Sequence, residues 1–323
     1  MYRRDIRFKD PKPIEIMIRM LCILALAVLA AEIALGAAPQ QRSYASAEDA
    51  VQDLVVGVKA HDKKALLDML GADATPLIES GDPIADRNAG DRFIKAYNQS
   101  HALTRSDDTK TILEIGKDRW PFPIPIVKEN DGWRFDTAAG KEEVLNRRIG
   151  RNELDVMQVS LAYVDAQREY YRRNPQKDAL MQYAQKFIST TGRRDGLYWQ
   201  TAPGDAPSPL GPLAAQARAE GYKAGGDKPT PYHGYYYKIL TAQGPYAKGG
   251  AYDYMVRGKL VGGFALVAYP AEYGNSGIMS FIVNHDGVVF QKDLGSTSAA
   301  AAAAMTKFNP DKSWQAVEDM PNS

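Results

Sequence analysis

Cysteine is nearly absent from this sequence of 323 residues, and histidine is scarce. The single cysteine, Cys22, lies in an N-terminal apolar run, and only four histidines are present. No histidine has a second histidine or a cysteine at the spacing of a metal site, and removal of the N-terminal segment would leave no thiol. The sequence therefore predicts neither thiol catalysis nor a metal centre.

An excess of charge of one sign is also missing. The chain has 40 lysines and arginines against 39 aspartates and glutamates, which gives a net charge of +1. A nucleic-acid-binding protein needs a basic field that attracts phosphates, and a near-neutral chain supplies none. We therefore expect no nucleic-acid partner.

The motifs of two common enzyme classes are absent as well. Gly221 to Lys228 (GYKAGGDK) has Asp227 where a phosphate-binding loop needs lysine, and Gly274 to Gly277 (GNSG) lacks the G-x-S-x-G spacing of a serine hydrolase. We therefore expect no cofactor and assign no catalytic residue. Whether the protein is an enzyme stays open, but a non-enzymatic role is favoured.

The N-terminal segment has the residue order of a secretory signal peptide. Six basic residues precede the apolar run 21–31, and small residues follow at 36–38. This order predicts a signal peptide over residues 1–37, with cleavage near Gly36 to Ala38. A protein processed in this way would be periplasmic or secreted.

Two features of this segment have alternative interpretations. Glu32 interrupts the apolar run before it reaches the roughly 20 residues that a membrane span needs, which favours cleavage over a retained anchor. If the segment were retained, it would be the one contact with a membrane. Translation could begin at Met1, Met17 or Met20, since a start at either later methionine gives a signal peptide of more usual length.

Residues 38–150 predict a first α+β domain. One helical pattern begins at Ser46 and a second at Asp62, and a third extends over Asp86 to His101. Three strand-like runs follow, at 110–116, 122–127 and 133–136. Prolines at 121, 123 and 125 restrict the middle run to an edge or a bulge, because proline cannot donate to a ladder. Helices followed by a curled antiparallel sheet resemble the cone-shaped fold of nuclear-transport-factor-like and cystatin-like proteins.

Three aspartates in this domain, Asp82, Asp86 and Asp91, could suggest a cation site. Their spacing fits no calcium-binding loop. Capping and the helix dipole explain acidic residues at a helix start equally well. We therefore interpret Asp82 and Asp86 as helix N-terminal residues.

Residues 151–323 predict a second α+β domain that begins with a long helix. Apolar residues on one face indicate a helix from Asn152 to Arg173, ended by Pro175. We expect a further helix over Lys177 to Ser189 and a shorter one over Leu213 to Glu220. Strand patterns then follow at 235–241, 263–269, 278–284 and 288–293, before a short alanine helix at 299–304.

The pair His285 and Asp286 stands between the last two of these strands. A catalytic interpretation requires the two side chains to converge, whereas neighbouring side chains on extended backbone diverge. Asp286-Gly287 between apolar runs is a strong hairpin signal, so we predict a hairpin turn. Both residues stay candidates for a ligand or interface contact.

Aromatic residues supply the other candidates for binding. Tyr235, Tyr236 and Tyr237 lie in a tyrosine-rich segment, and tyrosine suits core edges and interfaces alike. In the first domain, a pocket on the concave face of the sheet would lie near Trp120, Trp133 and Asp136.

Several strings distributed over the chain together resemble a bacterial exported family labelled domain of unknown function 2950. The strings are WPFPIP (120–125), RRIGRNELD (147–155), YVDAQREY (163–170), DGLYW (195–199), SPLGPL (208–213), YHGYYYKIL (232–240) and FIVNHDGVVFQKDLG (281–295). This resemblance implies export but no activity. The part from Asn152 onward also resembles the globular domains of type IV pilins and pseudopilins, which implies a long helix packed on an antiparallel sheet.

These observations favour an exported, non-enzymatic protein that acts through protein or envelope contacts, with an unknown envelope protein as the possible partner. One alternative is a small-ligand-binding protein or a hydrolase that uses a pocket in the N-terminal cone-like domain. Another is an accessory of a pilus or secretion system.

Overall fold

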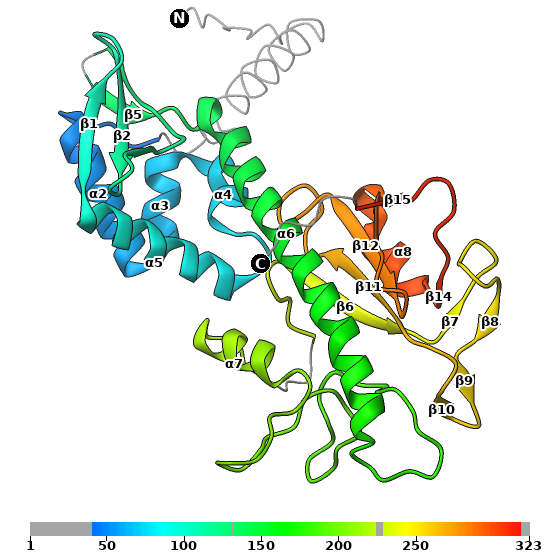
Figure 1. Ribbon diagram of the computed structural model, residues 1–323. Coiled ribbons are helices and arrows are strands. Elements are labelled where there is room, and N and C mark those ends of the chain that lie inside the picture. The colour runs from blue at the N-terminus through cyan, green and yellow to red at the C-terminus, as the bar shows by residue number, and fades with distance from the viewer. Residues whose placement is uncertain (1–40, 131, 224–228, 318–323) are drawn as a thin grey trace, which may run out of the picture. The chain divides into compact units, whose positions relative to one another are not determined.

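The computed structural model describes residues 41–130, 132–223 and 229–317, which belong to one compact unit (Figure 1). The predicted signal peptide over residues 1–37, including Cys22, lies outside the described residues. Within the described ranges, no helix is both long enough and apolar enough to cross a membrane. The fold is α+β, as the sequence predicts.

The N-terminal helices begin where side-chain caps satisfy their first amide groups. The helices are α2 (Ala47–Ala60), α3 (Lys63–Leu70), the short η2 (Ala72–Ala74) and α4 (Thr75–Ile78), and α5 (Pro83–Gln99). Ser46, Asp62 and Asp82 accept backbone hydrogen bonds at the starts of α2, α3 and α5. The two starts predicted at Ser46 and Asp62 are confirmed, and so is the capping role of Asp82.

Five antiparallel strands follow these helices (Figure 1). They are β1 (His101–Arg105), β2 (Lys110–Ile115), β3 (Trp120–Pro121), β4 (Ile126–Glu129) and β5 (Gly132–Phe135), paired in the order β1-β2-β4-β5 with β3 beside β2. The strand expected over 122–127 starts only at Ile126, because Pro123 and Pro125 cannot donate to a ladder. Leu113, Ile126 and Phe135 are buried in the N-terminal hydrophobic core, together with side chains of α2.

A single helix, α6 (Thr137–Arg173), connects the two halves of the chain. Residues 141–150 are helical, so the predicted domain division at residue 150 falls inside α6. Asp136 caps its first turn through the Ala139 amide at 3.2 Å. Gly140 allows the helix to approach the chain at 123–124, since a Cβ there would lie 2.5 Å from the Pro123 carbonyl oxygen.

The segment after α6 differs from the prediction. The helix expected over Lys177 to Ser189 is wrong, since this segment is irregular and forms single bridges, Tyr183 with Leu260 and Ile188 with Tyr198. Its backbone amides bond to distant carbonyl groups, which tertiary contacts supply and local periodicity does not reveal. The shorter helix predicted at 213–220 is confirmed as α7 (Gly211–Ala219).

The C-terminal part is built on a second antiparallel sheet. Its strands are β6 (Tyr235–Leu240), β11 (Ala265–Pro270), β12 (Met279–Asn284), β13 (Val289–Asp293) and β15 (Gln315–Ala316), in the order β15-β13-β12-β11-β6. Helices α6 and α8 (Ser298–Ala304) pack on this sheet. The predicted hairpin is confirmed, because β12 pairs with β13 across a turn in which Gly287 has φ +83°.

Smaller strands extend this half of the chain. They are β7 (Ala242–Gln243), β8 (Tyr252–Asp253), β9 (Met255–Val256), β10 (Lys259–Leu260) and β14 (Lys307–Phe308). The second hydrophobic core lies between α6 and the main sheet, and includes Tyr163, Phe264 and Phe281.

Candidate functional site

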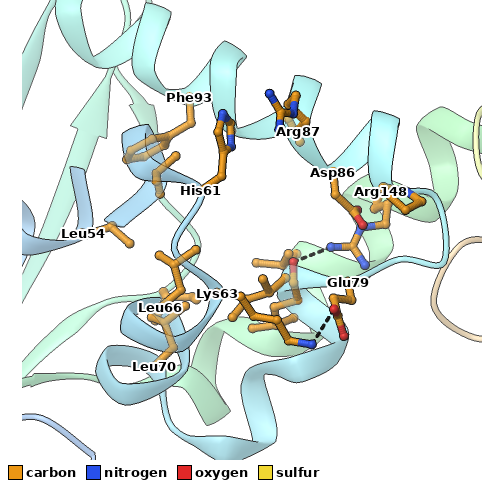
Figure 2. A pocket seen from close by; sticks show the side chains of 18 of the residues that line it. Leu54, His61, Lys63, Leu66, Leu70, Glu79, Asp86, Arg87, Phe93 and Arg148 are labelled. Atoms are coloured by element: carbon orange, nitrogen blue, oxygen red, sulfur yellow. Dashed lines mark hydrogen bonds and ion pairs between the residues drawn. The ribbon is translucent and has the colours of Figure 1, made fainter. Parts of the chain in front are cut away.

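A cavity of about 620 Å³ opens among the N-terminal helices (Figure 2). Apolar side chains from helices α2, α3, α5 and α6 and from the segment before β4 form much of its wall. They include Leu54, Val58, Leu66, Leu70, Phe93, Phe122, Ile124 and Val144. The volume falls within the range of about 300–1,000 Å³ that is usual for small-molecule sites.

Charged side chains gather on another side of the cavity, apart from its leucine wall (Figure 2). Lys63 forms an ion pair with Glu79. Arg148 of α6 donates to the Pro76 carbonyl at 2.6 Å and to the Leu77 carbonyl at 2.5 Å, and it also contacts the side-chain oxygen of Asn275. Arg148 is therefore held in place by neutral acceptors.

Asp86 lies near Arg148 on the same side of the cavity (Figure 2). Its carboxylate accepts a hydrogen bond from the Ser80 amide at 3.0 Å. Burial raises the pKa of Asp86, although the Ser80 hydrogen bonds and the charge of Arg148 oppose this rise. Burial also disfavours the charged form of Arg148, which lowers the pKa of this guanidinium. Both groups have lost part of their hydration, so a polar ligand group could replace it.

The lining of the cavity lacks hydroxyl and thiol side chains. Its residues include no serine, threonine or cysteine that could serve as a nucleophile. His61 lies with its Nε2 atom 3.8 Å from Asp91 Oδ1, which is longer than a hydrogen bond.

Trp120, Trp133 and Asp136 do not line this cavity. Trp120 is 60% exposed on β3, and Trp133 packs against the N-terminal core while its backbone pairs with Tyr44. Asp136 caps α6. Apart from Asp86, the residues that form the cavity were not among the candidates that the sequence suggests.

The three consecutive tyrosines of β6 have different surroundings. Tyr235 is fully buried, and its hydroxyl donates to the Met279 carbonyl at 2.9 Å. Tyr236 and Tyr237 line a second cavity of about 560 Å³. Other aromatic residues in its wall are Tyr163, Phe187, Tyr198, Tyr222 and Tyr232.

His285 and Asp286 are not joined by a hydrogen bond in the described part of the chain. The His285 ring packs edge to face with Tyr254 and Phe264, at centroid distances of 5.7 and 6.2 Å. Asp286 is exposed, and its amide donates to the Asn284 side chain at 3.1 Å. Their arrangement is that of a hairpin turn.

A cluster around His233 is the polar feature that sequence reasoning missed. Its Nδ1 lies 2.6 Å from an Asp155 oxygen on α6, and its Nε2 lies 2.8 Å from a Glu220 oxygen just after α7. The backbone of His233 has φ +53°, and Gly234 follows with φ +75°. Asp155 is 78 residues away in sequence, so no local spacing could indicate the contact.

This cluster links α6 to the segments that follow α7 and precede β6. Burial by itself would lower the pKa of His233, but hydrogen bonds and attraction from Asp155 and then Glu220 outweigh that effect and raise it. An imidazole that donates from both nitrogens is protonated. Since both nitrogens are occupied, His233 has none left for proton transfer to a substrate.

Asp82 strengthens the same region. It is fully buried and accepts hydrogen bonds from the Tyr222 hydroxyl at 2.8 Å and from the Gly234 amide at 3.0 Å, besides capping α5. Across residues 41–130, 132–223 and 229–317, no group of three or more histidine, cysteine or acidic residues is arranged to hold a metal ion.

Comparison with family models matches residues 41–317 to the family described as proteins of unknown function (DUF2950). The chain belongs to this family, as the strings in its sequence suggest. Comparisons with curated proteins and with solved structures found no significant match. The resemblance to pilins and pseudopilins stays a prediction.

Proposed function

We propose that this protein is an exported binding protein that holds a small molecule in the cavity among helices α2, α3, α5 and α6. The observation that carries the proposal is the cavity itself, which has a volume of about 620 Å³ and a wall of mostly apolar side chains with a few charged groups. This proposal replaces the role through protein or envelope contacts that the sequence by itself favours.

The wall of the cavity indicates the class of ligand. Its apolar side chains suit a hydrophobic body. The charged side carries three cations, Lys63, Arg87 and Arg148, and three carboxylates, Glu79, Asp86 and Glu272. Balanced charge disfavours a highly charged ligand, so the best fit is an amphipathic molecule with a polar end near Arg148 and Asp86.

Export is the second element of the proposal, and the order of residues 1–37 supports it. Mass spectrometry of the chain purified from its native cells would give its N-terminal residue. An N-terminus between residues 37 and 39 supports secretion, and an intact apolar segment contradicts cleavage.

Two tryptophan substitutions on α2 test the binding site. Val58 lines the cavity, whereas Val56 on the same helix is 62% exposed. Val58→Trp should fill the cavity, while Val56→Trp adds the same ring to the surface. Titration with the amphipathic fluorophore anilinonaphthalene sulfonate should give at least about tenfold weaker binding for Val58→Trp, equivalent to roughly 1.4 kcal/mol, and no change for Val56→Trp.

Native mass spectrometry of the cell-derived protein would then search for a bound molecule. A ligand present in the parent chain and in Val56→Trp, but absent from Val58→Trp, supports the proposal. Equal fluorophore binding by all three proteins would contradict it and return the preference to an envelope partner.

A further inference from the structure

A third concavity, of about 370 Å³, lies on the other side of α5 from the leucine-lined wall of the first cavity. Three of its lining residues are cations from two helices. Arg92 and Lys95 belong to α5, where a spacing of three places them on one face, and Arg151 belongs to α6. The concavity shares no lining residue with the cavity of about 620 Å³, and it shares Tyr222 with the cavity of about 560 Å³.

Although Asp91, Asp155 and Glu220 line the same concavity, these three cations are not paired with a carboxylate within the described ranges. None of them forms an ion pair within 4.0 Å, and none donates a side-chain hydrogen bond there. By contrast, Arg42, Arg119, Arg134, Arg147 and Arg173 each pair with a carboxylate. The three cations of this concavity therefore differ from those five arginines.

The two arginines also influence each other electrostatically. The pKa of Arg92 is lowered, first because nearby atoms displace its water and then because Arg151 is close, while attraction from Asp155 and Glu220 partly opposes this lowering. Like charges that share a concavity repel, and an anion bound between them would remove the repulsion.

Two of the three acidic residues of the same concavity are already engaged, and the third, Asp91, is exposed. Asp155 and Glu220 both contact the His233 ring, whose single positive charge when protonated offsets one of the two carboxylates. Asn88 donates to the Glu220 carbonyl at 2.8 Å, and Asn152 donates to the Ser276 carbonyl at 2.9 Å. The Asp155–His233–Glu220 unit thus holds the wall in place and leaves the three cations available.

We propose that Arg92, Lys95 and Arg151 form a binding site for a phosphate group, either inorganic phosphate or the phosphate of a small monoester. Guanidinium groups bind phosphate oxygens through two parallel hydrogen bonds. With His233 protonated, the four cations of this concavity outnumber its three carboxylates, which favours an anion. This site goes beyond the proposed amphipathic ligand and is independent of it.

Isothermal titration of the purified full chain with inorganic phosphate and with glycerol phosphate tests the site. Replacing both arginines, Arg92→Gln with Arg151→Gln, should weaken binding at least about tenfold, since charge-assisted hydrogen bonds are lost. The matched control is Lys117→Gln with Lys312→Gln, which removes two exposed cations that line none of the described cavities. It should bind phosphate as the parent chain does.

A charge-preserving pair, Arg92→Lys with Arg151→Lys, separates geometry from net charge and should bind with intermediate affinity. Tighter binding of glycerol phosphate than of inorganic phosphate would identify a phosphorylated small molecule as the ligand. Undetectable binding of both at millimolar concentration, equal binding by the glutamine pair, or a preference for succinate over phosphate would overturn the proposal. Val58→Trp should leave phosphate binding unchanged, which keeps this test separate from that of the amphipathic ligand.

Discussion

The two hydrophobic cores of the molecule differ in the side chains that fill them. Among the largest fully buried side chains, the N-terminal core contributes one aromatic ring, Phe135, and otherwise methionine, leucine and isoleucine. The C-terminal core contributes four tyrosines and three phenylalanines. They are Tyr163, Tyr170, Tyr235, Tyr254, Phe264, Phe281 and Phe308.

The buried tyrosines add hydrogen-bonding requirements to the C-terminal core. Each buried hydroxyl needs a partner, and Tyr163, Tyr170 and Tyr235 donate to backbone carbonyls of Ala265, Arg194 and Met279. Aliphatic side chains impose no such requirement. An aliphatic wall can therefore border an open cavity without leaving polar groups unpaired, as in the N-terminal part, whereas the cavity of about 560 Å³ in the C-terminal part is bordered by tyrosines.

Truncation of a buried side chain should show the largest difference between the two parts in the loss of unfolding free energy. Phe281→Ala removes a side chain that is 1% exposed and should lower the free energy of unfolding by about 3–5 kcal/mol. Leu66→Ala, in the cavity wall, should cost about 1–2 kcal/mol, because this half-buried leucine already borders open space. Urea unfolding measures both, and equal losses would contradict the difference in packing.

Removal of Asp82 should disturb the contact between the start of α5 and the chain before β6. Asp82→Ala leaves the Tyr222 hydroxyl and the Gly234 amide without their acceptor, besides removing a helix cap, and should cost about 2–4 kcal/mol. Asp136→Ala removes only the cap of α6 and should cost about 1 kcal/mol. If thermal or urea unfolding gave the same loss for both, the buried hydrogen bonds of Asp82 would contribute nothing.

The His233 cluster should make stability depend on pH. Because its pKa is raised above the ordinary value of 6.5, the ion pairs stabilise the fold fully below that pH and are lost as pH rises through the raised pKa. His233→Gln should therefore cost about 2 kcal/mol at pH 6 and less at pH 9. Urea titrations at both pH values measure this cost, and His101→Gln, at an exposed histidine without an ion pair in the described ranges, is the control. A cost that grows with pH would have the wrong sign.

Removal of a single hydroxyl tests how much a buried tyrosine hydrogen bond contributes to the stability of the C-terminal core. Tyr235→Phe keeps the ring and removes the hydrogen bond to the Met279 carbonyl, so the expected loss is about 1 kcal/mol. Tyr246→Phe alters a side chain that is 63% exposed and should change stability by less than about 0.5 kcal/mol. Indistinguishable unfolding midpoints for the two variants would show that the buried hydroxyl does not contribute.

Local features of the fold were predictable because neighbouring residues determine them. Ser46 and Asp62 cap helices through amides three residues ahead, and Gly287 permits the turn between β12 and β13. The helix expected at 177–189 failed for the opposite reason. There the backbone finds partners such as Leu260, far away in the sequence.

The sequence by itself determined the α+β class, the helix caps, the final hairpin and membership of the family, since these depend on local pattern and on strings of residues. Only the tertiary structure decided where chemistry could take place. It brought Arg92 toward Arg151, joined His233 to Asp155 and Glu220, and left a cavity among aliphatic helices. Such contacts join side chains that lie far apart along the chain, so no local period or spacing encodes them.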